Sequence, residues 1–177
     1  MKRYISLLRG INVGGKNIIK MSELKACFEN LGFIRVVTYI QSGNVLFDSD
    51  ETETEFLTRK IETELSAQFN YVSKIVLVDQ QHLIQIVNAA PEGFGSRTDE
   101  FRYDVIFLKP PLTAKDTISQ IKTKEGVDFV NAGDGVIYFS RLSQLSSQSQ
   151  MTKLMGTAVY KEMTIRNWNT TLKLCDL

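Results

Sequence analysis

Apolar positions along the first 79 residues alternate between the period of a strand and the period of a helix. Aliphatic and β-branched residues favour strands, whereas apolar residues that recur every third or fourth position favour a helix face. The stretch before Ser42-Gly43-Asn44 and the stretch after it are joined so tightly that they must pair antiparallel. The predicted order is β-α-β-β-α-β, with strands at 4–8, 33–41, 45–47 and 74–79 and helices at 22–31 and 52–69.

The second half of the chain repeats this order, with shorter helical patterns. A loop at 91–96 contains Gly and Pro and is the best predicted boundary. Strands are expected at 102–108, 127–130, 136–139 and 157–163, and helices at 80–89, 113–122, 151–155 and 167–175. We therefore expect an α+β fold of two ferredoxin-like halves, each an antiparallel sheet with helices on one face, plus an extra C-terminal helix. The expected divisions are a first half at 1–79, a connecting helix and loop at 80–101, and a second half at 102–177.

Composition narrows the class of protein without naming one. The chain has 177 residues, of which 43% are hydrophobic and 23% are charged, which is the mix of an ordinary globular domain and excludes disorder or a coiled coil. No apolar run approaches the roughly 18 residues that cross a bilayer, so we expect no membrane association. Two cysteines make no disulfide framework, which favours a reducing cytoplasm. With a single histidine and no C-x-x-C motif, we expect no metal and no cofactor.

Charge is balanced overall but uneven along the chain. The formal net charge is +1, which argues against a protein that coats nucleic acid through bulk electrostatics. Residues 1–47 nevertheless hold seven basic and two acidic residues, whereas residues 48–70 hold two basic and seven acidic ones. A local basic site for one or a few phosphate groups therefore stays open.

The glycine-rich loop after the first strand carries the strongest local signal. From Gly10 to Lys16 it fits the phosphate-binding pattern G-x-x-x-x-G-K, but Asn17 stands where a metal-binding hydroxyl belongs, and the predicted sheet is antiparallel. We therefore reject a nucleoside triphosphatase. What stays is a general anion site, in which Gly14 and Gly15 offer backbone N–H groups and Arg9, Lys16 and Lys20 offer charge. The alternative is a plain glycine-rich connection with solvated lysines.

Two further polar patches accompany this loop. The turn at 38–44 carries Tyr39, Gln41 and Asn44, which either bind a ligand or close the turn. At helical spacing, Trp168, Leu172 and Cys175 share the face expected to be buried. The same spacing places four polar side chains together on another face, with the arginine near the helix N-terminus where an anion is favoured: Arg166, Asn169, Thr170 and Lys173.

These three blocks together resemble a bacterial family of proteins of unknown function, DUF1697. The resemblance rests on residues 7–17 with Lys20-Met21, on residues 38–45, and on the pattern Thr164-x-Arg166-Asn167-Trp168-Asn169-Thr170-x-x-Lys173-Leu174. It implies a small bacterial protein with a duplicated α+β architecture. It implies no activity, cofactor or catalytic residue, and it groups the three blocks as one signature.

We interpret the three blocks as one anion-binding cleft for a phosphate-bearing small molecule, a nucleotide or a short RNA. The expected ligand-binding residues are Arg9, Asn12, Gly14, Gly15, Lys16, Tyr39, Gln41, Asn44, Arg166, Asn169 and Lys173. Two alternatives stay open. A non-catalytic RNA-binding module would stack bases on the strand aromatics Tyr39, Phe47, Tyr103 and Phe107, and purely structural polar clusters would only join the fold. Whether a bond is made or broken is undecided at this level.

Overall fold

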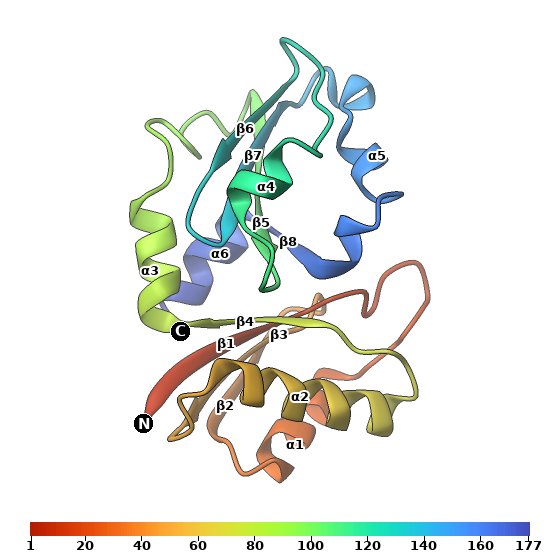
Figure 1. The fold of residues 1–177 in the computed structure, drawn as a ribbon, viewed down its shortest axis with the longest axis vertical. Helices are drawn as coiled ribbons and strands as arrows, with labels where there is room; N and C mark the ends of the chain where they lie inside the picture. The colour runs from red at the N-terminus through yellow and green to blue at the C-terminus, as the bar shows by residue number, and fades with distance from the viewer. The chain divides into compact units, whose positions relative to one another are not determined.

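Two four-stranded antiparallel sheets of the same strand order form the framework of the chain (Figure 1). The structure is a computed structural model that describes all residues from 1 to 177. It falls into two units, the first comprising residues 1–83 with Leu177 and the second residues 84–176. The predicted α+β fold with two similar halves is confirmed.

The first unit has the sheet order β2-β3-β1-β4, with α1 and α2 on one face (Figure 1). Its elements are β1 (Lys2–Leu8), α1 (Met21–Asn30), β2 (Ile34–Tyr39), β3 (Asn44–Ser49), α2 (Thr54–Phe69) and β4 (Ile75–Asp79). The core lies between the sheet and these helices and includes Tyr4, Phe28, Phe47 and Ile61. The apolar helix positions predicted from periodicity, such as Leu24 and Leu57, are fully buried in it.

The tight turn between β2 and β3 lies against the loop that follows β1. Gly43 has φ +78°, and a Cβ at this position would overlap the side chains of Ile11 and Leu8. Leu8 donates its N–H to the Gly43 carbonyl at 2.8 Å. Only glycine fits both the left-handed backbone and this close approach, so the sequence signal Ser42-Gly43-Asn44 marks a packed turn.

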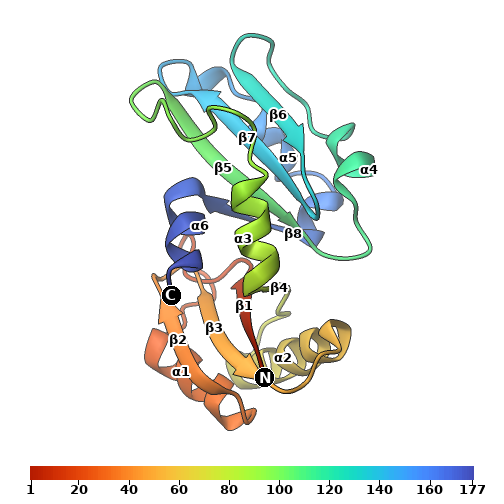
Figure 2. The same cartoon turned by 90° about the vertical axis from the view of Figure 1, so that its left-hand side faces the viewer.

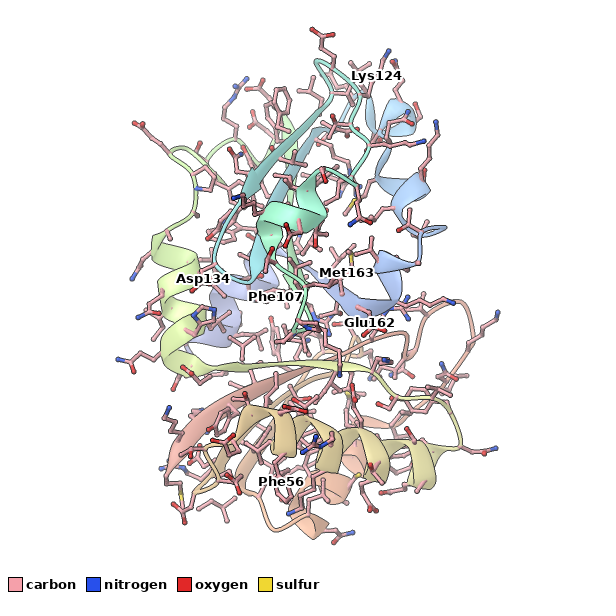
Figure 3. All side chains as sticks on the ribbon, in the orientation of Figure 1. Phe56, Phe107, Lys124, Asp134, Glu162 and Met163 are labelled. Carbon is pink, nitrogen blue, oxygen red and sulfur yellow. The ribbon has the colours of Figure 1, made fainter.

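The second unit has the order β6-β7-β5-β8, and Figure 2 shows α4 and α5 on one face of its sheet. Its elements are α3 (Gln80–Asn88, beginning in the first unit), β5 (Phe101–Leu108), α4 (Ala114–Ile118), β6 (Asp128–Ala132), β7 (Val136–Leu142), a 3-10 turn η1 (Ser146–Gln148), α5 (Met151–Leu154), a 3-10 turn η2 (Val159–Glu162), β8 (Met163–Asn167) and α6 (Trp168–Cys175). Its core includes Ile106, Ile137, Phe139 and Met163. Lys124 lies in the loop between α4 and β6 (Figure 3).

Two sequence predictions about element ends were wrong. The last strand is β8, at 163–167, and not residues 157–163, because residues 159–162 turn in a 3-10 helix and only from Met163 onward does the chain pair with β5. The first helix, predicted from residue 22, begins at Met21, and its N-cap residue Lys20 makes no side-chain capping bond. None of the helices combines the length and the apolar character that crossing a bilayer requires.

Candidate anion-binding site

The glycine loop of the first unit forms a two-residue hairpin turn. Gly14 and Gly15 have φ +58° and +74°, and Lys16 donates its N–H to the Val13 carbonyl at 3.1 Å. Positive φ at both central residues is the signature of a type I′ turn. Helix α1 begins only at Met21, so no helix N-terminus follows Lys16 as it does in a phosphate cradle.

Asparagine side chains hold this loop in place. Asn12, at φ 53°, donates from Nδ2 to the carbonyls of Ile19 and Gln41 and accepts from the Ile19 N–H. Asn44 is fully buried and donates to the Tyr39 carbonyl and the Ser42 hydroxyl. The glycine loop and the turn between β2 and β3 therefore lie side by side in the first unit. The side-chain amides of Asn12 and Asn44 stabilise them mainly by hydrogen bonds to backbone groups.

The C-terminal segment differs from its predicted geometry. Arg166 lies in β8 and not in the first turn of α6, so it does not share a helix face with Asn169 and Lys173. Its guanidinium donates to Thr164 Oγ1 at 2.7 Å and to the Ile165 carbonyl at 2.9 Å, and burial lowers the pKa of Arg166 to about 10. On α6 the buried residues are Trp168, Thr171 and Leu174; the predicted core residue Leu172 is 38% exposed.

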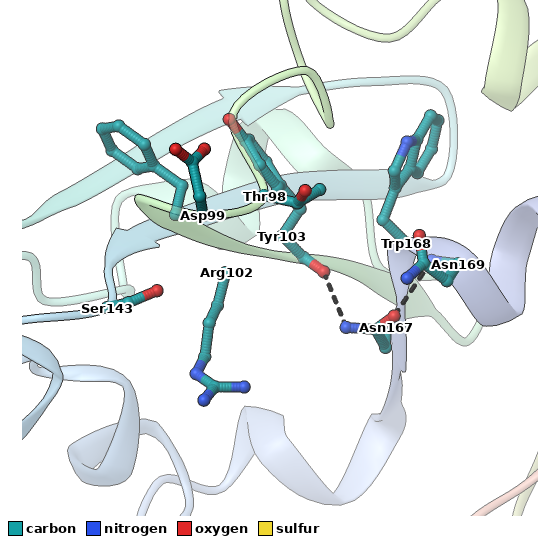
Figure 4. A pocket seen from close by; sticks show the side chains of 9 residues that line it. Thr98, Asp99, Arg102, Tyr103, Ser143, Asn167, Trp168 and Asn169 are labelled. Carbon is teal, nitrogen blue, oxygen red and sulfur yellow. Dashed lines mark hydrogen bonds between the residues drawn. The ribbon is translucent and has the colours of Figure 1, made fainter.

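The predicted ligand residues divide between the two units. Those in the first are Arg9, Asn12, Gly14, Gly15, Lys16, Tyr39, Gln41 and Asn44, and those in the second are Arg166, Asn169 and Lys173. The single cleft predicted from sequence stays a prediction. The structure does contain a cavity of about 320 Å³ wholly within the second unit, and Asn169 is part of its wall (Figure 4).

The cavity lies where β5 begins and β8 ends. Figure 4 shows Asp99 and Arg102 pointing to opposite sides of the β5 ribbon and Trp168 at the other end of the group. Asn167 holds the wall together: its Nδ2 donates to the Tyr103 carbonyl at 3.4 Å, and its Oδ1 caps α6 by accepting from the Asn169 N–H at 2.9 Å. The wall consists of Thr98, Asp99, Phe101, Arg102, Tyr103, Ser143, Asn167, Trp168 and Asn169.

Trp168 fixes the loop that borders the cavity. Its indole packs edge-on against the Phe94 ring, with 5.1 Å between the two ring centroids. Phe94 in turn packs edge-on against Tyr103 and Tyr138. A Cβ at Gly95 would overlap the indole nitrogen of Trp168. The glycine in the predicted boundary loop thus permits the loop backbone to lie directly on the tryptophan ring.

Charged side chains continue from the cavity along the face of the second sheet that α4 and α5 cover, called here the helix-covered face. Ile106 and Ile137 point to this face, into the core with α4 and α5, and by the two-residue alternation of a strand so do Arg102 and Arg141. These two arginines are direct partners across β5 and β7. Like charges placed directly opposite each other in a sheet are destabilising. The Nε–H of Arg141 is buried without an acceptor.

Asp104 is the nearest acidic neighbour of this arginine pair. Its Oδ2 lies 3.7 Å from Nη2 of Arg141, too far for a hydrogen bond, and its side chain is 15% exposed. Burial raises the pKa of Asp104, while Arg141 and then Arg102 act to lower it. The ion pair with Arg141 favours the ionised form of Asp104, whereas burial favours the neutral form. Burial has the larger effect on the pKa because the attraction to Arg141 acts over a long distance.

Both cysteine thiols lie in surroundings that favour the protonated form. Burial raises the pKa of both thiols, Cys27 and Cys175, to about 11, with smaller contributions from Glu64 and Asp176 respectively, so neither is a thiolate near neutral pH. No three His, Cys, Asp or Glu side chains gather in a way that would hold a metal ion.

Sequence reasoning missed Arg102, Asp104, Ser143 and Arg141. One signal was present: Arg102 and Asp104 occupy alternate positions of a strand whose same-face residues, Ile106 and Leu108, are core residues. The partner Arg141 depends on strand register, which the sequence pattern did not specify.

Comparison with known proteins gives a family and a structural relative. The family model described as "Protein of unknown function (DUF1697)" matches residues 1–138. The chain is similar to a solved structure titled as that of the conserved bacterial protein SP0830 from Streptococcus pneumoniae, with 27% sequence identity, a TM-score of 0.84, and coverage of 99% of this chain and 97% of that one. No curated protein matches.

The asparagine contacts predict unequal effects of alanine substitution. Asn12→Ala removes three hydrogen bonds and leaves backbone groups without partners, so we expect a loss of about 1–3 kcal/mol in the free energy of unfolding. Asn169 is exposed, and its backbone N–H bond to Asn167 survives substitution, so Asn169→Ala should stay within about 0.5 kcal/mol of wild type. Urea unfolding measures both, and equal losses would contradict the assignment.

Gly95 and Gly93 form a matched pair for the loop on Trp168. Both have positive φ, but a Cβ at Gly93 meets nothing closer than 3.7 Å. Gly93→Ala should therefore cost only backbone strain, about 1–2 kcal/mol, and Gly95→Ala about 1–3 kcal/mol more from overpacking. Because Trp168 is the only tryptophan, its fluorescence spectrum should shift in Gly95→Ala and not in Gly93→Ala.

Asp104 should make stability depend on pH in a defined direction. A carboxyl whose pKa is raised on folding binds protons more readily in the folded state, so its contribution falls as pH rises through the folded pKa. The stability gained by Asp104→Asn over wild type should grow between about pH 4, the ordinary value for Asp, and pH 7. Denaturant midpoints across this range measure it; a gain that is constant or shrinks with pH would show that burial does not dominate at Asp104.

Proposed function

Because the chain belongs to the family described as "Protein of unknown function (DUF1697)", a description that assigns no activity, we propose a function from its own residues: the second unit binds a small phosphate-bearing molecule in the cavity beside Arg102. The observation that carries this proposal is the cross-strand pair of Arg102 and Arg141. An oxyanion near both guanidinium groups would relieve their repulsion and give the Arg141 Nε–H an acceptor.

The rest of the wall suits a polar ligand of modest size. Ser143 and Asn169 offer uncharged hydrogen-bonding groups, and Trp168 and Tyr103 offer aromatic surface. A volume of about 320 Å³ lies at the lower end of ordinary ligand pockets, which span about 300–1,000 Å³. A phosphorylated metabolite or a single nucleotide is therefore favoured over a dinucleotide.

The burial of the strand aromatics speaks against the RNA-binding alternative. Phe47 and Phe107 are fully buried and Tyr103 is 7% exposed, so these rings do not form an open stacking platform on a sheet face. The structural alternative fits Asn12, Asn44 and Asn167, whose side chains bond the backbone, but it gives no role to the arginine pair. A small-molecule site in the second unit gives the arginine pair a role and leaves these asparagines their structural one.

Calorimetric titration with inorganic phosphate and adenosine monophosphate tests the proposal. Arg102→Ala removes an exposed charge-bearing wall residue and should weaken binding at least tenfold, since a hydrogen bond to a charged group contributes about 1.5–3 kcal/mol. Arg59→Ala, an exposed arginine on α2 in the first unit, is the control and should bind as wild type does. Absence of binding to wild type, or equal binding by Arg102→Ala, would refute the proposal.

A further inference from the structure

Asp104, the cross-strand partner of the wall residue Asn167, has a carboxyl group whose ionised form would repel an anion in the cavity. We propose that Asp104 takes up a proton when an oxyanion binds beside Arg102 and Arg141, so that the site selects its ligand through coupled protonation. This inference rests on the proposed function and concerns the regulation of the same site. It is carried by the position of Asp104 beside the arginine pair, two residues after Arg102 on the same face of β5 and with its Oδ2 3.7 Å from Nη2 of Arg141.

Strand register places the groups around Asp104. On its own strand Arg102 precedes it by two residues on the same face, and across the sheet its partners are Phe139 on β7 and Asn167 on β8. Asn167 is also a wall residue of the cavity. Asp104 is its cross-strand partner and therefore lies next to the cavity wall.

The charges that face this region come from three strands and one loop. Arg102 and Arg141 are the cations, and Asp128 on β6 is the direct partner of Arg141. Only Oδ2 of Asp128 is hydrogen-bonded, accepting from the backbone N–H groups of Lys124 and Gln150 at 2.9 and 2.8 Å, whereas its Oδ1 is buried without a hydrogen-bond partner. Asp99 is a residue of the cavity wall, and the neighbouring Glu100 is paired with Arg97.

The surroundings of Asp104 favour a neutral carboxyl once an anion arrives. Its carboxylate accepts no hydrogen bond within the protein and meets Arg141 only at 3.7 Å, so it holds the arginine weakly. An incoming oxyanion adds a like charge and competes for the same guanidinium. Protonation of Asp104 removes that repulsion. The neutral carboxyl group can then donate an O–H hydrogen bond, whereas the carboxylate can only accept one. Burial, which already raises the pKa of Asp104, acts in the same direction.

Sulfate is the sharpest probe because, unlike phosphate, it does not titrate near neutral pH. If only the protonated form binds, the apparent Kd of wild type rises about tenfold for each pH unit above the pKa of Asp104 in the unliganded protein. Calorimetry in two buffers with different ionisation enthalpies should then show proton uptake approaching one per sulfate. Asp104→Asn should bind more tightly at neutral pH, with neither the pH slope nor the uptake.

Asp99→Asn is the matched control, since it removes an equal charge from a residue of the cavity wall itself. Asp99→Asn should change the sulfate affinity by about the same factor at every pH in the neutral range. Proton uptake on sulfate binding should stay as it is in wild type. Uptake that persists in Asp104→Asn, or disappears in Asp99→Asn, would overturn the assignment to Asp104. Failure of wild type to bind sulfate and phosphate at any pH would instead refute the site itself, and the inference with it.

A measurement on unmutated protein keeps the test independent of the variants. The carboxyl carbon of Asp104, followed by NMR with and without saturating sulfate, should show a higher pKa in the bound protein. An unchanged or lower pKa contradicts the inference even where Asp104→Asn alters folding. Asp104→Ser, a smaller uncharged replacement, should reproduce the loss of pH dependence.

Discussion

The pairing register of β5 with β7 is the constraint on which the candidate site depends. It sets Arg102 opposite Arg141 and places Asp104 beside them on the face that carries the core at its other end. A shift of one residue would turn these charges to the opposite face and bring Tyr103 and Val105 toward α4 and α5. Because Ile106 and Leu108 must stay in the core, burial of apolar surface fixes the position of the charges.

The same sheet thus serves two purposes along its length. Near Leu108 the helix-covered face is apolar and packs against α4 and α5; near Arg102 it is polar and opens into the cavity. Short helices make this arrangement feasible, since α4 and α5 have five and four residues and cover only part of the face. In the first unit, α2 has sixteen residues and covers a longer core.

Polar residues with a strong sequence signal have mainly architectural roles. Asn12 and Asn44 satisfy backbone groups of a loop and a turn, Gly14 and Gly15 form a hairpin turn, and Asn167 caps α6. Loops need such residues because their backbone groups lack the regular partners of helices and sheets. A motif rich in Gly and Asn therefore marks irregular backbone first, and a ligand only when further observations point to one.

From the sequence alone came the order of elements, the duplicated α+β fold, the tight turn at Gly43 and the family resemblance, because hydrophobic period and turn chemistry are local properties. Sequence did not give the true start of β8, the buried strand position of Arg166 or the buried face of α6, which depend on packing against other elements. The arginine pair and its carboxyl belong to the tertiary structure entirely: residues 102 and 141 meet only through strand register, which is a long-range choice made by the whole core.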